Sequence, residues 1–191
     1  YGMPGPESAE EPVVHSTFDP EDADGGKIKD VSGNGFDAQL VGGAVIDTDN
    51  AIGKSNGAVE LDGETGYVEL PQNLIKDLHL EKMTISTWVK VKEDRANQRI
   101  FDFSSDTGRR VNRNTMYLST QGDSGNMEFA TVTPFTEKFA NENSLLDLNY
   151  KYALRAPKLS TGEWHHVAVT IEGFDAVLYV DGEEVARSST Y

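Results

Sequence analysis

Four oxygen-bearing side chains lie in or near turns rich in glycine, where a hard cation could bind. Asp30 and Asn34 flank or lie within the turn at 32–35, Asp19 directly follows the expected strand 14–18, and Asp62 comes later in the chain. Calcium prefers carboxylate and carbonyl oxygens, and glycine lets backbone carbonyls turn inward. We therefore predict a calcium site at Asp19, Asp30 and Asn34, with Asp62 as an outlying candidate. The alternative is ordinary turn residues, because Asp and Asn favour turns by themselves.

Aromatic and polar side chains on expected strands form a second candidate group, suited to carbohydrate. Alternation along a strand puts Trp88 opposite the Val and Ile positions, and likewise Trp164 and His166. An exposed aromatic ring can stack on a sugar ring while polar neighbours bind its hydroxyls. The alternative is that both tryptophans fill packing gaps. The predicted ligand-binding residues are Trp88, Arg99, Tyr117, Trp164, His166 and Tyr179. Of these, Arg99 would bind an acidic group.

The sequence contains no recognisable catalytic set. Glycoside hydrolysis uses a pair of carboxylates, and no run such as Glu-x-Asp-x-x-Glu, which would place them on one face of a strand, occurs in this chain. The patterns Gly-x-Ser-x-Gly and His-Glu-x-x-His are also absent. His165 and His166 are adjacent on an expected strand, so they point to opposite faces and do not suit one metal ion. We predict that the chain is not an enzyme.

From residue 13 onward the chain consists mainly of short segments in which apolar and polar residues alternate, separated by turns. The clearest is 83–92, where β-branched residues alternate with polar residues and Trp88. Many short strands with regular turns indicate an all-β fold, a two-sheet antiparallel jelly-roll sandwich. Further strands are expected at 14–18, 37–41, 99–103, 115–119, 126–131, 164–171, 176–180 and 184–186, with a hairpin formed by 58–61 and 67–70.

Three segments interrupt this rhythm. Residues 1–12 are rich in proline, glycine and glutamate, which is typical of a linker. The polar loop 104–114 carries Arg109, Arg110 and Arg113, which suit an anionic sugar, a neighbouring domain or, in preference to both, plain solvation. The long connection at 133–159 is expected to hold a short helix near 137–148.

The charge balance excludes two classes of partner. The chain has 32 acidic and 17 basic residues and a formal net charge of −15. Such a surface repels nucleic acid and anionic membrane, because both are bound through Lys and Arg. No apolar run approaches the ~20 residues of a membrane span. Cysteine is absent, so disulfides do not stabilise the fold.

Several segments, taken in order, resemble laminin-G-like jelly-roll domains of the concanavalin A-like lectin/glucanase superfamily, as found in secreted bacterial glycan-active proteins. The strongest is Trp-His-His-Val-Ala-Val-Thr at 164–170, followed by Leu-Tyr-Val-Asp-Gly at 178–182. Matching segments also occur at 16–19, 30–40, 57–63, 67–71 and 83–90.

The resemblance implies a concanavalin A-like fold of two antiparallel sheets, one of them concave, and often a structural calcium ion near the first strand. Such domains normally close with a further strand resembling Gly-x-Ile-Asp-Glu-Val-Arg, which this chain lacks. We therefore expect residues 13–191 to be one domain that continues beyond the end of this chain, since a missing strand would leave an unpaired edge.

These features favour a non-catalytic carbohydrate-binding or carbohydrate-associated module of a larger glycan-degrading enzyme, extracellular or at the bacterial cell surface. Its expected partners are a glycan and the neighbouring domains of the same polypeptide. The alternative is a structural or adhesive spacer with no sugar site. A catalytic hydrolase is disfavoured because the carboxylate set is missing.

Overall fold

The computed structural model describes residues 11–49, 56–72, 74, 82–104, 115–122, 124–138, 145–173 and 175–188. The chain forms two compact units, Tyr1–His79 and Leu80–Tyr191. The predicted loop with Arg109, Arg110 and Arg113 lies outside the described residues, as does the predicted linker apart from its last two residues. The predicted single domain at 13–191 stays a prediction.

The first unit contains short antiparallel strands. β1 (Ala23–Asp24), β2 (Lys27–Ile28), β3 (Ala38–Val41) and β6 (Tyr67–Glu69) form one sheet in the order β1-β2-β3-β6. β4 (Val45–Asp47) pairs with β5 (Ala58–Glu60), and a 3-10 turn, η1, covers Pro20–Asp22.

Two expectations for the first unit were wrong. Residues 58–61 and 67–70 do not form a hairpin with each other, because β5 pairs with β4 and β6 pairs with β3. Between them, the Asp62 carboxylate accepts the backbone N–H groups of Glu64, Thr65 and Gly66, which folds the link into a compact loop. The segment 14–18 is not a strand, and Phe18 has a φ of 59°, which a strand does not accommodate.

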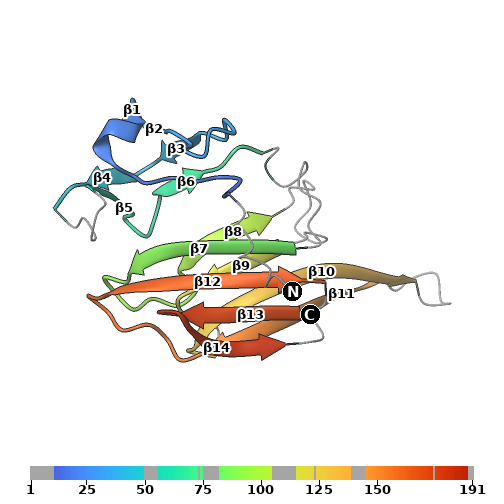
Figure 1. Ribbon diagram of the computed structural model, residues 1–191. Helices are drawn as coiled ribbons and strands as arrows, with labels where there is room; N and C mark the ends of the chain where they lie inside the picture. Colours follow the sequence, from blue (N-terminus) through green and yellow to red (C-terminus); the bar gives the residue numbers. More distant parts are fainter. Residues whose placement is uncertain are drawn as a thin grey trace, which may run out of the picture. The chain divides into compact units, whose positions relative to one another are not determined.

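The second unit is a two-layer antiparallel sandwich (Figure 1). One sheet has the order β14-β13-β12-β7, from β7 (Lys82–Lys90), β12 (Trp164–Glu172), β13 (Asp175–Val180) and β14 (Glu183–Ser188). The other has the order β11-β10-β9-β8, from β8 (Arg99–Ser104), β9 (Thr115–Ser119), β10 (Met127–Lys138) and β11 (Leu145–Ala156). The predicted all-β sandwich is confirmed.

The hydrophobic core of this unit draws on both sheets. Alternate residues of each strand point inward, so Leu118 and Phe129 of one sheet meet Val167, Val169 and Leu178 of the other in one cluster. The complete buried cluster is Val91, Leu118, Met127, Phe129, Leu154, Ala156, Leu159, Val167, Val169, Ala176 and Leu178.

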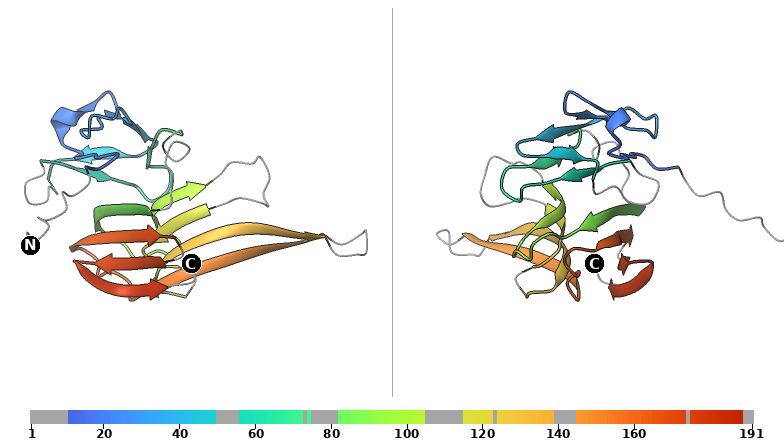
Figure 2. Two further views of the ribbon diagram at one scale, coloured as in Figure 1. Left: turned by 45° about the vertical axis from the view of Figure 1, so that its right-hand side comes forward. Right: turned by 90° about the vertical axis from the view of Figure 1, so that its left-hand side faces the viewer.

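β10 and β11 form a long hairpin where a short helix was expected near 137–148. The two strands pair continuously from Met127↔Ala156 to Lys138↔Leu145, whereas β9 pairs only with Glu128–Val132. The outer part of the hairpin therefore extends past the neighbouring strand as a two-stranded ribbon (Figure 2). The helix expectation failed because strand pairing overrode local preference.

Truncation of a core residue should separate packing from surface effects. Val169 is 1% exposed within the sandwich core, whereas Val185 is 37% exposed on β14. Val169→Ala is expected to lower the free energy of unfolding by about 1–3 kcal/mol through lost burial and a residual cavity. Val185→Ala should change it by less than about 0.5 kcal/mol. Urea denaturation measures both, and equal losses would contradict the assignment of the core.

Candidate functional site

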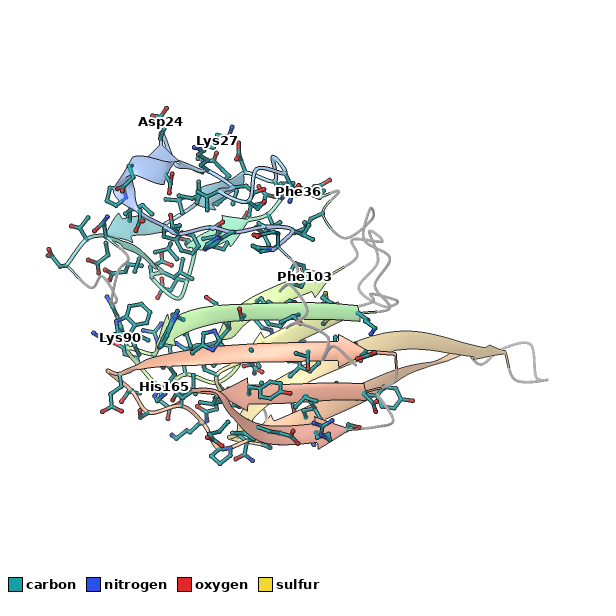
Figure 3. All side chains as sticks on the ribbon, in the orientation of Figure 1. Asp24, Lys27, Phe36, Lys90, Phe103 and His165 are labelled. Atoms are coloured by element: carbon teal, nitrogen blue, oxygen red, sulfur yellow. The ribbon has the colours of Figure 1, made fainter. Side chains whose placement is uncertain are left out.

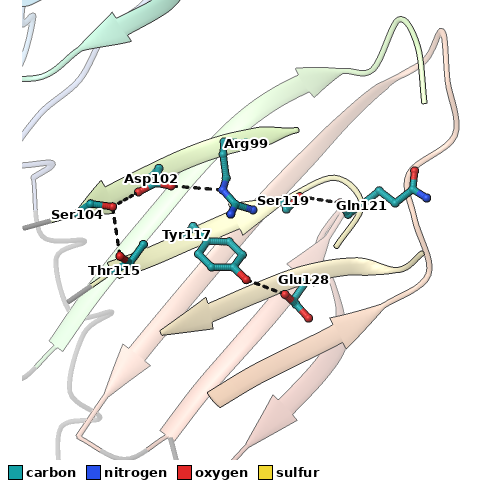
Figure 4. A network of polar contacts seen from close by, with 8 residues as sticks. All are labelled: Arg99, Asp102, Ser104, Thr115, Tyr117, Ser119, Gln121 and Glu128. Carbon is teal, nitrogen blue, oxygen red and sulfur yellow. Dashed lines mark hydrogen bonds and ion pairs between the residues drawn. The ribbon is translucent and has the colours of Figure 1, made fainter. Parts of the chain in front are cut away.

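A row of polar side chains crosses one sheet of the second unit on the face that points away from the core. Strand pairing places Arg99 beside Ser119, Ser119 beside Glu128, and Glu128 beside Arg155. Their chain neighbours Leu118, Phe129 and Leu154 belong to the core cluster. Because side chains alternate along each strand, the polar row must lie on the opposite face. Figure 4 draws Arg99, Ser119 and Glu128 of this row.

Glu128 is the centre of this row. Its side chain is 1% exposed, and its carboxylate accepts hydrogen bonds from the Tyr117 hydroxyl at 2.8 Å and from Arg155 Nε at 3.0 Å. A buried carboxylate is tolerated only with such partners. The backbone also approaches closely, because a Cβ at Gly122 would lie 2.9 Å from the Cβ of Glu128.

Arg99 reaches the row through a local irregularity of β8. The register shifts between Arg99 and Phe101, so Ile100 and Phe101 both pack against the core and Arg99 joins the face that carries Asp102. Its guanidinium lies 3.7 Å from the centre of the Tyr117 ring, and its Nε lies 3.3 Å from an Asp102 carboxylate oxygen. The arginine is thus held by a cation–π contact and by an ion pair.

The other predicted sugar-binding residues lie on the second sheet of this unit. Trp88 on β7 is 52% exposed, and its ring meets the His166 ring edge-on at 5.3 Å between centroids. Trp164 and Tyr179 occupy positions of the same face, the one that alternates with the core residues Val167 and Leu178. The structure therefore divides the six predicted residues into two groups, Arg99 with Tyr117 and Trp88 with Trp164, His166 and Tyr179.

Sequence reasoning missed Glu128 and Arg155. No motif in the sequence marks them, because their role comes from pairing with β9 and with each other across strands. The available signal was indirect. Glu128 falls between two core residues of an expected strand, where alternation sends it to the face opposite the core.

His165 has a hydrogen-bonded arrangement that resembles a serine hydrolase triad. Its Nε2 lies 2.7 Å from Ser160 Oγ, and its Nδ1 lies 2.8 Å from Asp181 Oδ2. The Ser160 hydroxyl donates its single proton to Glu163 at 2.7 Å, so His165 does not receive it as a general base would. The contact instead links the start of β12 (Figure 3) with the turn between β13 and β14, and the His165 hydrogen bond lowers the pKa of Asp181.

The predicted calcium ligands lie in the first unit and are engaged with the backbone. Asp30 accepts N–H groups of His15, Ser32 and Phe36, and Asp19 accepts that of Asn56.

Asn34 donates its side-chain N–H to the Val13 carbonyl, and Asp62 accepts three backbone N–H groups together with the Thr65 hydroxyl. These bonds hold the pKa of Asp62 well below its usual range. Among the described residues no group of three or more acidic, His or Cys side chains converges on one point, so as arranged these residues do not form one ligand set. The calcium site stays a prediction.

Comparison with known proteins gives a family and a fold. A family model described as "Concanavalin A-like lectin/glucanases superfamily", Laminin_G_3, matches residues 62–191. A similar solved structure is domain 4 of AbnA, a GH43 extracellular arabinanase from Geobacillus stearothermophilus, in complex with arabinotriose. It is 19% identical, has a TM-score of 0.64, and the match covers 94% of this chain and 75% of that one. No curated protein matches significantly.

The Asp30 carboxylate should make stability depend on acid. Asp30 is 4% exposed, and although burial alone would raise its pKa, hydrogen bonds from Ser32, His15 and Phe36 lower it to about 2. Since the folded value lies below the unfolded one, its contribution is present above about pH 4 and lost as the pH falls toward 2. Asp30→Asn is expected to cost about 2 kcal/mol at pH 7 and much less at pH 2, by urea unfolding.

The matched control is Asp24→Asn, which changes an exposed carboxylate of the same unit. It should leave the pH dependence of stability unchanged. A loss for Asp30→Asn that is as large at pH 2 as at pH 7 would contradict this role of the carboxylate.

Proposed function

Because the chain belongs to the concanavalin A-like lectin/glucanase superfamily, we propose that it is a non-catalytic module that binds carbohydrate. The carrying observation is a set of five residues on the polar face of the β8–β11 sheet, in which Asp102 and Tyr117 join Arg99, Glu128 and Arg155. We call these five residues the polar row below. Planar polar groups fixed beside an aromatic ring are the elements with which proteins bind sugar hydroxyls and sugar rings.

The polar row combines two buried residues with two arginines whose side chains are partly exposed. Glu128 and Tyr117 are buried, whereas the side chains of Arg99 and Arg155 remain partly exposed. A ligand on this face would meet guanidinium groups whose orientation is already fixed by their carboxylate partners. Such preorganisation reduces the entropy lost on binding.

The similar structure supports the same class of ligand. That domain carries arabinotriose, a neutral oligosaccharide, and it comes from an extracellular arabinanase. By analogy we propose that this chain belongs to a larger secreted bacterial protein that acts on glycans, with neighbouring domains as further partners. No helix among the described residues is long and apolar enough to cross a membrane.

The arrangement of charged groups favours binding over catalysis. Glycoside hydrolysis requires one carboxyl group to stay protonated as an acid. Glu128 is instead held by hydrogen bonds from Arg155 and Tyr117, so its carboxylate is engaged with the protein. The hydroxyl of Ser160 is directed at Glu163 rather than at His165, so the triad-like contact offers no activated nucleophile.

One observation favours the alternative, a structural spacer. Among the described residues, every buried side-chain nitrogen and oxygen already has a hydrogen-bond partner. The polar row therefore needs no ligand to satisfy its buried groups. Binding experiments decide between the two functions.

Substitution of Arg99 should test glycan binding. Arg99→Ala removes the guanidinium over Tyr117 and is expected to weaken binding of arabinotriose at least about tenfold, measured by isothermal titration calorimetry. The matched control is Arg187→Ala, because Arg187 also forms an exposed i,i+3 ion pair, with Glu184 on the other sheet. It should leave binding unchanged.

Trp88→Ala tests the other face of the unit. If Trp88→Ala abolished binding and Arg99→Ala did not, the sugar would bind on the β7–β12–β13 sheet, and the assignment of the site to the polar row would be wrong. If no neutral or acidic oligosaccharide bound the intact chain, the spacer function would be favoured.

The calcium site is kept as a proposal on the donor types of Asp19, Asp30 and Asn34. Calcium at a hundredfold excess over its dissociation constant should stabilise the chain by about 2.7 kcal/mol and raise the Tm by several degrees. Differential scanning calorimetry with calcium, with magnesium and with a chelator measures this. Identical melting curves under all three conditions would remove the proposal.

A further inference from the structure

We infer that the polar row selects neutral glycans and rejects glycans that carry carboxylates. This inference rests on the proposed glycan binding and adds the charge class of the ligand. It differs from the expectation drawn from sequence, in which Arg99 would bind an acidic group. The difference comes from the partners that the structure gives to each arginine.

Each arginine of the polar row is already paired with a carboxylate. Arg99 lies 3.3 Å from Asp102, and Arg155 lies 3.0 Å from Glu128. Two guanidinium groups and two carboxylates leave the row with no formal net charge. Neither arginine is therefore an uncompensated cation that would attract an acidic sugar.

The buried position of Glu128 strengthens the discrimination. A sugar carboxylate that bound Arg155 would lie within a few ångströms of a second carboxylate that is 1% exposed. Like charges at such short range repel strongly where water is excluded. The overall formal charge of −15 adds a weaker, salt-dependent repulsion at longer range.

The same geometry leaves donors for hydroxyl groups. Both arginines contact their carboxylates through Nε, and no hydrogen bond within the described part of the chain occupies their terminal Nη atoms. A guanidinium held in a fixed plane presents its remaining N–H groups in a fork. Such a fork suits two adjacent hydroxyls of a neutral sugar.

The test compares a neutral and an acidic trisaccharide, arabinotriose and trigalacturonate, by isothermal titration calorimetry. The intact chain should bind the neutral ligand with an affinity that changes less than about twofold between low and high salt. Trigalacturonate should bind at least about tenfold more weakly at low salt.

Two substitutions remove one negative charge each from the row. Asp102→Asn changes the partly exposed carboxylate that pairs with Arg99, and Glu128→Gln changes the buried carboxylate that pairs with Arg155. The Gln amide still offers an acceptor to Arg155 and a donor to Tyr117. Each should strengthen trigalacturonate binding by about threefold to fivefold at low salt. Circular dichroism verifies folding, and Asp102→Asn keeps the test valid if Glu128→Gln does not fold.

Glu184→Gln is the matched control, because it makes the same change of net charge beside Arg187 on the other sheet. It should leave both affinities unchanged. The inference is overturned if the intact chain prefers trigalacturonate, if Asp102→Asn brings no gain, or if Glu184→Gln brings an equal gain. In each of these cases glycan binding itself stands, whereas failure of both sugars to bind would overturn the proposed function as well.

Discussion

The carboxylate of Glu128 is buried, with 1% of its side chain exposed, so it needs hydrogen-bonding and charged partners to be stable there. The architecture of the candidate site follows from this requirement. Tyr117 donates to one oxygen and Arg155 to the other, from the strands on either side of β10. Removing β11 would take away the cationic partner Arg155, and removing β9 would take away the Tyr117 donor. The sheet therefore holds the site together, and the site in turn fixes the register of the sheet.

The same strand also supplies the core. Phe129 follows Glu128 directly and is fully buried between the two sheets, together with Leu118 and Val169. A slip of one residue in β10 would send Phe129 to the polar face and Glu128 into the apolar core. Core packing and the arrangement of the polar row thus depend on one register, so a mutation that weakens the core of this unit should also misplace the arginines.

Alternation in the sequence predicted the strands of the second unit well, because segments such as 83–92 and 164–171 have a strict two-residue period. Alternation failed to predict the structure where the conformation of a segment depends on which strand it pairs with. The described residues of 137–148 lie in the paired strands β10 and β11 instead of a helix, and 58–60 pairs with a different strand from the one expected. The secondary-structure propensity of a segment does not determine which other strand it will pair with.

The site was predictable only in part for the same reason. Arg99 stands out by its residue type, although simple alternation would have placed it beside Phe101 on the core face. The register shift after Arg99 moves this residue to the polar face, and the residue types around it do not predict that shift. Glu128 and Arg155 become visible only when four strands are laid side by side.

The most direct test follows individual side chains by nuclear magnetic resonance while arabinotriose is added to ¹⁵N-labelled protein. We expect the Nε–H signals of Arg99 and Arg155 to shift in proportion to saturation, while the indole N–H signals of Trp88 and Trp164 stay in place. Movement of the two indole signals with unmoved arginine signals would contradict binding at the polar row and would assign the ligand to the opposite sheet.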